Sequence, residues 1–209
     1  MSKAIILDLD DTIFRTKSMD SKIFQPFFEF FTHQLKSIFE EQVIENINED
    51  LWRFPWDHVI AKYSIPYEIV VSSIDVMNQL SFDLNIVPYS DYDFIETLPY
   101  PKYLVTTGLS ALQKAKIEAL KIGHGFDKIV INDTFLEAKS KLDIFTELRM
   151  EFGLNPEHTY IIGDNPNSEI KAGNELNMVT IQILREGVTK GHNAQHYIHS
   201  FYELEQIMK

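Results

Sequence analysis

The sequence predicts an α/β protein: a Rossmann-like, doubly wound parallel sheet with an inserted all-helical segment. Two observations support this fold class. Short, continuous apolar runs alternate with amphipathic helical stretches over most of the chain, whereas one segment near the N-terminus shows helical periodicity only. Continuous apolar runs are typical of strands covered on both faces. Alternation of such strands with helices favours right-handed parallel crossovers.

The first predicted element is a buried strand at the N-terminus, and four similar apolar runs follow later in the chain. The expected strands are 4–7, 103–105, 129–131, 160–162 and 179–183. Helical periodicity between and after the later runs predicts helices over 110–121, 141–152 and 169–178.

The segment between the first and second strands breaks this rhythm. Apolar residues recur at helical spacing in three stripes, which run from Phe24 to Ile38, from Trp56 to Tyr63 and from Tyr67 to Met77. A further short helix is expected over 90–97. We therefore predict an α/β core domain of residues 1–14 and 86–209, and a helical cap domain of residues 15–85.

Composition narrows the function classes. The 209-residue chain has a formal net charge of −12 and no cysteine. Such an acidic chain is repelled by phosphate backbones and anionic lipids, so we expect neither nucleic acid nor membrane partners. The absence of cysteine excludes disulfides and thiolate chemistry. No apolar stretch approaches a signal peptide or a membrane span. We expect a cytoplasmic monomer or homodimer.

The strongest chemical signal is Asp8-Leu9-Asp10-Asp11-Thr12, directly after the first strand. Reactive groups gather at the carboxyl ends of strands in an open parallel sheet. Two close carboxylates must share a proton or a cation, and oxygen ligands suit a hard divalent cation. An aspartate-rich turn is the simpler interpretation of this motif taken alone.

Polar residues also follow other expected strands. Thr106, Thr107 and Gly108 come after the second strand, where a hydroxyl and free N–H groups can hold a phosphate. Gly163, Asp164 and Asn165 follow the fourth strand, and Glu169 lies five residues after Asp164. A lysine, Lys139 or Lys141, stands at the start of the intervening helix, where it can neutralise a bound anion.

The order of these features resembles the haloacid dehalogenase-like hydrolase superfamily, over roughly residues 1–14 and 86–209. The helical insertion resembles a cap of that superfamily in position, size and helicity. The resemblance implies that Asp8 is a nucleophile forming an aspartyl-phosphate and that Asp10 is the general acid/base. It also implies that Thr106 binds phosphoryl oxygens.

The resemblance further implies a magnesium ion held by Asp8, the Asp10 carbonyl and Asp164, with Glu169 where relatives often have a second aspartate. Magnesium suits phosphoryl transfer better than calcium, and zinc is disfavoured without cysteine or a close histidine pair. For the phosphate-neutralising lysine, spacing favours Lys139. Lys141 is the alternative if the helix starts later.

The expected activity is a magnesium-dependent phosphatase acting on a small phosphorylated metabolite. A mutase would use the same core residues. A catalytically silent phosphate-binding protein is a third interpretation, although such proteins usually lose one of the acidic residues of these motifs. A haloacid dehalogenase is disfavoured, because dehalogenases of this superfamily lack the acid at the position of Asp10.

Overall fold

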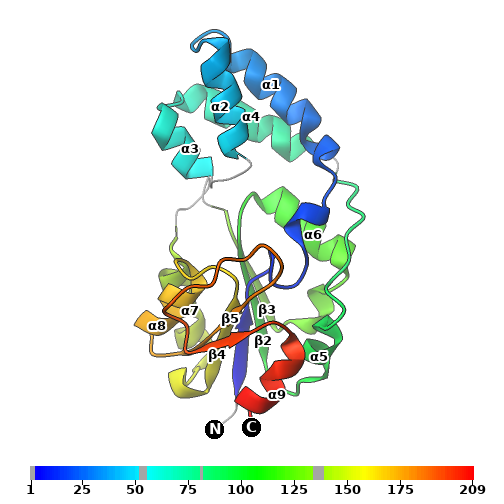
Figure 1. Ribbon diagram of the computed structural model, residues 1–209, viewed down its shortest axis with the longest axis vertical. Helices are drawn as coiled ribbons and strands as arrows, with labels where there is room; N and C mark the ends of the chain where they lie inside the picture. Colours follow the sequence, from blue (N-terminus) through cyan, green and yellow to red (C-terminus); the bar gives the residue numbers. More distant parts are fainter. Residues whose placement is uncertain (1–2, 52–55, 81, 134–138) are drawn as a thin grey trace. The chain divides into compact units, whose positions relative to one another are not determined.

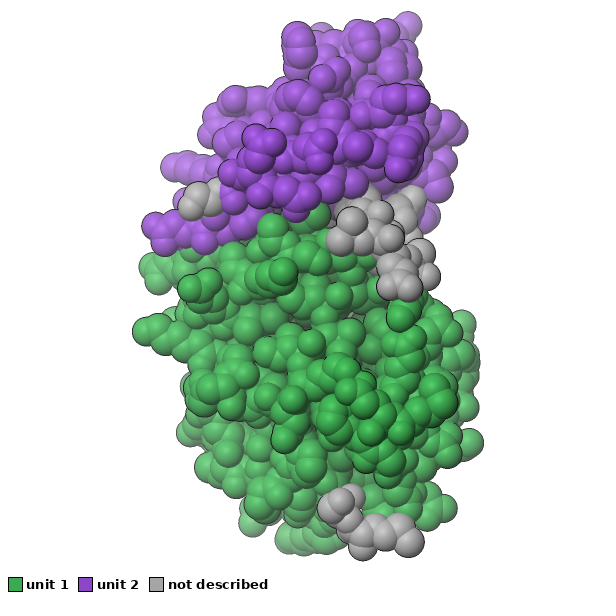
Figure 2. Space-filling model, turned by 180° about the vertical axis from the view of Figure 1, so that it is seen from behind, with its two compact units in different colours: residues 1–19, 84–209 green, residues 20–83 purple. Residues whose placement is uncertain are grey.

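The computed structural model describes residues 3–51, 56–80, 82–133 and 139–209. The chain separates into two compact units (Figures 1 and 2). Unit 1 comprises Met1–Met19 and Leu84–Lys209, and unit 2 comprises Asp20–Asp83. The domain division at 14/15 and 85/86 stays a prediction; the units divide at 19/20 and 83/84.

Unit 1 is built on a six-stranded sheet in the order β3-β2-β1-β4-β5-β6, and every neighbouring pair of strands is parallel. The strands are β1 (Ala4–Leu7), β2 (Lys102–Thr107), β3 (Lys128–Asn132), β4 (Thr159–Gly163), β5 (Val179–Ile183) and β6 (His196–Ile198). β1, which comes first in the chain, lies in the middle of the sheet, because the strand order reverses between β1 and β4.

Helices cover both faces of this sheet (Figure 1). They are α5 (Tyr92–Thr97), α6 (Ser110–Leu120), α7 (Lys141–Phe152), α8 (Glu169–Glu175) and α9 (Leu204–Ile207). Successive β1 residues point to opposite faces, so Ile5 and Leu7 pack in the core with α5, α6 and α9, whereas Ala4 and Ile6 pack with α7 and α8. Full burial on both faces explains why β1 is a continuous apolar run.

The regular structure of unit 2, over its described residues, is helical. Its helices are α1 (Gln25–Leu35), α2 (Glu41–Leu51), α3 (Trp56–Tyr63) and α4 (Tyr67–Gln79). Phe27 and Phe31 of α1 are buried, and their rings lie 4.9 and 5.5 Å from the Trp56 ring of α3. The predicted aromatic stripe is thus a packing surface, although Ile38, at its predicted end, lies beyond α1 and is 49% exposed.

The structure confirms the predicted fold class. Each of the five expected strands is present, and the helices over 110–121, 141–152 and 169–178 are present with small changes at their ends. Sequence reasoning missed the edge strand β6 and the helices α2 and α9.

Candidate active site

The predicted aspartates and threonines lie at the carboxyl ends of β1, β2 and β4, beside the point where the strand order reverses. This is where open α/β sheets bind ligands. A cavity of about 250 Å³ opens there. Its lining consists of Asp8, Asp10, Asp11, Thr106, Thr107, Lys141, Asp164, Asn165, Ser168 and Glu169.

Asp8 directly follows β1 and forms an ion pair with Lys141. The Lys141 Nζ donates to Asp8 Oδ1 at 2.6 Å and to the Val105 carbonyl at 2.7 Å. The Asp8 side chain is 12% exposed and the Lys141 side chain is 7% exposed. Burial raises the pKa of the Asp8 carboxyl, against the pull of Lys141. Burial alone would lower the pKa of Lys141, but Asp8 and Glu169 raise it above its ordinary value, so the ammonium stays charged.

Asp10 lies two residues further on, and helix α6 holds its carboxylate. Lys116 Nζ donates to Asp10 Oδ1 at 2.7 Å, and Gln113 Nε2 donates to Oδ2 at 3.0 Å. The Thr16 hydroxyl also donates to Oδ1, at 3.2 Å. Asp8 and Asp10 therefore have different cationic partners, one from each face of the sheet.

Arg185, just after β5, fastens the loop that carries Asp10. Its guanidinium donates to both Asp91 carboxylate oxygens at 2.8 and 2.9 Å, and to the Thr12 carbonyl at 3.2 and 3.3 Å. The guanidinium carbon lies 4.1 Å from the Tyr89 ring centroid and 4.7 Å from that of Phe201. This bidentate pair anchors the end of the Asp8–Thr12 segment to the core.

Thr106 and Thr107 end strand β2. The Thr106 hydroxyl is buried and lies 2.9 Å from Gln113 Nε2, which also donates to the Thr107 carbonyl at 2.9 Å. Both threonines line the cavity, and Thr107 is the more exposed of the two.

Asp164 and Glu169 form a second acidic group, after β4. Glu169 is 2% exposed, and its Oε1 accepts from the Asn165 N–H at 2.6 Å. Gly163 makes this possible, because a Cβ at that position would lie 2.3 Å from the Glu169 side chain. Burial and then the neighbouring acids raise the pKa of Asp164 to about 8 and that of Glu169 to about 7.

All the predicted site residues except Lys139 line the cavity. Spacing favoured Lys139, whereas Lys141, the alternative, is the lysine whose ammonium reaches Asp8. Ser140 caps α7 through a capping box with Asp143, so the helix starts at Lys141. Lys139 lies outside the helix, and its ammonium pairs with Glu147 at 2.9 Å.

Sequence reasoning missed Gln113 and Lys116. With Ile117 and Leu120 they form the buried stripe of α6, at positions i, i+3, i+4 and i+7. Two polar residues on a stripe that faces the core were the available signal. Leu112 and Ala115, two apolar residues of the same helix, are only half-buried.

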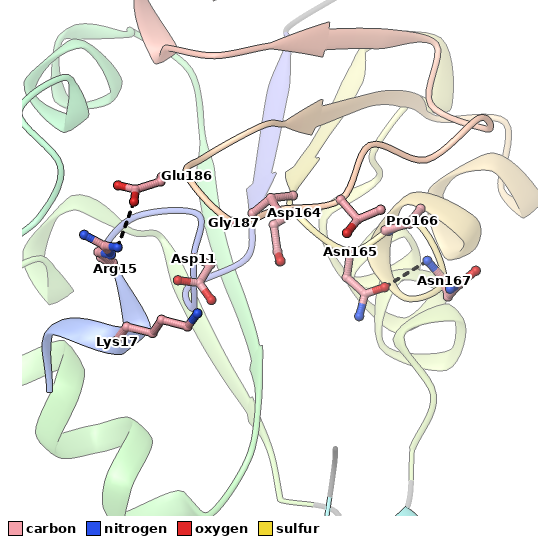
Figure 3. Close-up of a pocket in the computed structure, with 11 residues that line it drawn as sticks. Asp11, Arg15, Lys17, Asp164, Asn165, Pro166, Asn167, Glu186 and Gly187 are labelled. Carbon is pink, nitrogen blue, oxygen red and sulfur yellow. Dashed lines mark hydrogen bonds and ion pairs between the residues drawn. The ribbon is translucent and has the colours of Figure 1, made fainter. Parts of the chain in front are cut away.

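A second cavity, of about 320 Å³, adjoins the first and shares Asp11, Asp164 and Asn165 with it. Figure 3 shows Arg15 and Lys17 entering from the segment after β1, opposite the turn from Asn165 to Asn167. Arg15 pairs with Glu186 at 3.2 Å.

The donor set of the first cavity fits a hard cation. Its acidic side chains and backbone carbonyls are oxygen donors, and buried carboxylates with raised pKa values gain from a nearby positive charge. Within the described residues, no three acidic or histidine side chains converge to hold a metal by themselves. Two carboxylates, Asp8 and Asp164, with a backbone carbonyl and water ligands, is the pattern that suits magnesium.

Comparison with known proteins places this arrangement in a family. Residues 5–183 match the family model of haloacid dehalogenase-like hydrolases. The chain belongs to this family. It is therefore a hydrolase, and the family match spans the motifs at Asp8, Thr106, Lys141 and Asp164.

A full-length relative has a named activity. Glyceraldehyde 3-phosphate phosphatase from Methanocaldococcus jannaschii is 26% identical, and the alignment covers 100% of this chain and 98% of the relative. The chain thus has a curated phosphatase relative along its whole length, including the segment that forms unit 2.

Solved structures share the fold. A chain described as the HAD-hydrolase YfnB from Bacillus subtilis, bound to magnesium, aligns with a TM-score of 0.65 at 17% identity over 100% of this chain and 99% of its own. A HAD phosphatase from Thermococcus onnurineus aligns with a TM-score of 0.65 at 18% identity, over 99% and 97%. None of the helices in the described part of the chain is long and apolar enough to cross a membrane.

Proposed function

We propose that this hydrolase is a magnesium-dependent phosphatase that releases phosphate from a small phosphorylated metabolite through an aspartyl-phosphate on Asp8. The observation that carries the proposal is the buried pair of Asp8 and Lys141, at 2.6 Å, in a cavity that also holds Asp10, Thr106 and Asp164. A carboxylate nucleophile, an acid/base, a hydroxyl and a fixed cation are the groups that this reaction requires.

In the first step, an Asp8 carboxylate oxygen attacks phosphorus, and the bond from phosphorus to the leaving oxygen breaks. Asp10 gives its proton to that oxygen as it leaves. Thr106 and Lys141 bind the phosphoryl oxygens and stabilise the negative charge on them in the transition state. In the second step, water attacks the phosphorus of the aspartyl-phosphate, Asp10 accepts the water proton, and phosphate and the free Asp8 carboxylate result.

Magnesium would be held by Asp8, the Asp10 carbonyl and Asp164, and when bound it supplies positive charge that offsets the negative charge of the phosphoryl group and the carboxylates. Glu169 would support it through water or through its bond to the Asn165 N–H, because Oε1 already accepts that N–H. The magnesium-bound neighbour and the raised pKa of Asp164, about 8, support this assignment.

The proposed substrate is a small phosphorylated metabolite. The relative's substrate, glyceraldehyde 3-phosphate, is the first compound to test. The adjoining cavity with Arg15 and Lys17 offers polar groups for the part of the substrate beyond its phosphate. We also propose that residues 15–85 act as the cap of this enzyme. A cytoplasmic location and a monomeric or homodimeric state stay predictions.

The test is phosphate release from glyceraldehyde 3-phosphate, glycerol 3-phosphate and p-nitrophenyl phosphate, with magnesium and with EDTA. Asp8→Asn is nearly isosteric but a poor nucleophile, so it should abolish release, as EDTA should for the native enzyme. Asp75→Asn, at an exposed position on α4, is the matched control and should keep full activity. Undiminished release by Asp8→Asn would refute the mechanism.

A further inference from the structure

Helix α6 carries a buried lysine and a buried glutamine where an apolar stripe is expected. Lys116 and Gln113 are 4% and 2% exposed, and they share their helix face with Ile117 and Leu120. An ammonium and an amide lose their water when buried, so each needs a polar partner in the protein. Both find that partner in Asp10.

The contacts fix the Asp10 carboxylate at both oxygens. Oδ1 accepts from Lys116 Nζ at 2.7 Å and from the Thr16 hydroxyl at 3.2 Å, whereas Oδ2 accepts only from Gln113 Nε2, at 3.0 Å, among the described residues. A carboxylate oxygen has two lone pairs. The Asp10 side chain is 29% exposed and lines the catalytic cavity, so a lone pair of Oδ2 remains for an incoming group.

Lys116 and Gln113 each make a further contact besides those with Asp10. The Lys116 ammonium lies 5.8 Å from the centroid of the fully buried Phe14 ring, and Gln113 Nε2 also lies 2.9 Å from the Thr106 hydroxyl. The Gln113 Oε1 is buried, and it has no hydrogen-bond partner in the described part of the chain. A buried acceptor without a partner weakens the fold.

Stability alone does not explain these two residues. Replacing a buried ion pair by apolar side chains is often neutral or stabilising, and the same stripe already carries Ile117 and Leu120. Packing alone therefore does not require a polar pair at these two positions. The hydrogen bonds of the pair go to Asp10, the Thr106 hydroxyl and the Thr107 carbonyl, and all three residues line the catalytic cavity.

We propose that Lys116 is a positioning residue that holds the Asp10 carboxylate with Oδ2 toward the leaving oxygen, and that Gln113 links this orientation to Thr106. The inference rests on the proposed phosphatase activity. Proton transfer requires heavy atoms about 2.6–3.2 Å apart. Without Lys116, the carboxylate can rotate about its side-chain bonds, and fewer encounters place Oδ2 in reach.

The consequence is a dependence on the leaving group. An aryl oxygen leaves readily without a proton, whereas an alkyl oxygen needs the proton from Asp10. The experiment measures kcat and KM of the full chain with p-nitrophenyl phosphate and with glycerol 3-phosphate, for the native enzyme, Lys116→Met and Lys116→Gln. Asp10→Asn is the reference variant, and Lys114→Met, at an exposed position of the same helix, is the matched control.

We expect kcat of Lys116→Met to fall at least tenfold more for the alkyl than for the aryl phosphate, in the same direction as Asp10→Asn, while KM changes little. Lys114→Met should behave as the native enzyme. Lys116→Gln keeps a shorter, uncharged donor at this position, so we expect a smaller loss that is again greater for the alkyl phosphate. It is the variant to measure if Lys116→Met does not fold, as judged by its melting temperature.

If both Lys116 variants lose activity to the same extent with the aryl and the alkyl phosphate, Lys116 only stabilises the structure. That result would overturn this inference and leave the proposed function standing. Native kinetics in both Lys116 variants would overturn the inference as well. If the native chain releases phosphate from no compound, the proposed function fails, and this inference fails with it. The native enzyme, run beside every variant, separates these cases.

Discussion

Helices α6 and α7 lie on opposite faces of the sheet, and each supplies a buried lysine to one aspartate of the same motif. Lys141 meets Asp8 at 2.6 Å and Lys116 meets Asp10 at 2.7 Å, so the two pairs have nearly the same length. The acids differ, because the Asp8 side chain is 12% exposed and that of Asp10 is 29% exposed. The pair of Asp8 and Lys141 is therefore buried, whereas the Asp10 side chain of the other pair is partly exposed.

The second contacts of the two lysines differ too. Lys141 is the first residue of α7 and also donates to the backbone carbonyl of Val105, so a strand of the sheet fixes it. Lys116 lies in the middle of α6 against the Phe14 ring. In the proposed mechanism, Lys141 contacts the carboxylate that attacks phosphorus, and Lys116 contacts the carboxylate that transfers the proton.

The largest expected effect separates the two lysines by their kinetics. Lys141→Met removes the ammonium that would lie beside the bound phosphoryl group, so kcat/KM should fall by about 10²–10³. The fall should be similar for p-nitrophenyl phosphate and glycerol 3-phosphate, because both substrates carry the same phosphoryl group. Steady-state kinetics with both substrates, on protein shown to be folded by circular dichroism, make the measurement.

A loss by Lys141→Met that is much greater for the alkyl phosphate would contradict this division of roles. It would mean that the α7 lysine also controls leaving-group protonation. The two variants would then show no kinetic difference, since both lysines would act on the same step.

Sequence reasoning offered Lys141, on the α7 side of the site, as one of two candidate lysines, and it missed Gln113 and Lys116 on the α6 side, for a physical reason. Strand ends are recognisable where a buried apolar run is stopped by polar residues, as β1 is stopped at Asp8 and β4 at Asp164. Residues at those ends, such as Asp8 and Asp164, are therefore placed by the strands alone. Lys116 lies within a helix, where its only signal in the sequence is its helical spacing from Ile117 and Leu120.

The remaining differences between sequence and structure also come from weak local signals. β6 is a three-residue edge strand with His196 exposed, so it has no continuous apolar run. In α2, Ile44 and Ile47 are the buried apolar residues, set among acidic neighbours. The choice between Lys139 and Lys141 depended on where α7 starts, and the Ser140–Asp143 capping box was the clue in the sequence.

A medium effect is expected in the stability of the metal-free protein. The pKa of Asp164 is raised from 3.8 to about 8, so the folded state binds a proton more tightly than the unfolded state does. Folding stability must then fall as pH rises from about 4 to about 8, where the unfolded state has already lost that proton. Asp164→Asn removes this titration and should flatten the fall.

Melting temperatures in EDTA at pH 5 and pH 8 measure this effect. For a chain of this length, each 1 kcal/mol corresponds to about 2–4 °C. We expect Asp164→Asn to melt a few degrees above the native protein at pH 8 in EDTA, and added magnesium to raise the native value but not that of the variant. A constant difference between the two proteins from pH 5 to pH 8 would show that Asp164 does not carry the raised pKa.

The smallest expected effect belongs to Lys139, two residues before Lys141. Its ammonium pairs with Glu147 at 2.9 Å, and the two side chains are 34% and 53% exposed. Ion pairs of this kind contribute about 0–1 kcal/mol. Lys139→Met should therefore change kcat/KM less than about twofold and stability by at most about 1 kcal/mol.

Lys139→Met is also the matched control for Lys141→Met, since both variants remove one lysine charge near the start of α7. A loss of activity in Lys139→Met comparable to that of Lys141→Met would return the phosphate-binding role to the lysine that spacing favoured, and the enclosed pair of Asp8 and Lys141 would then be structural.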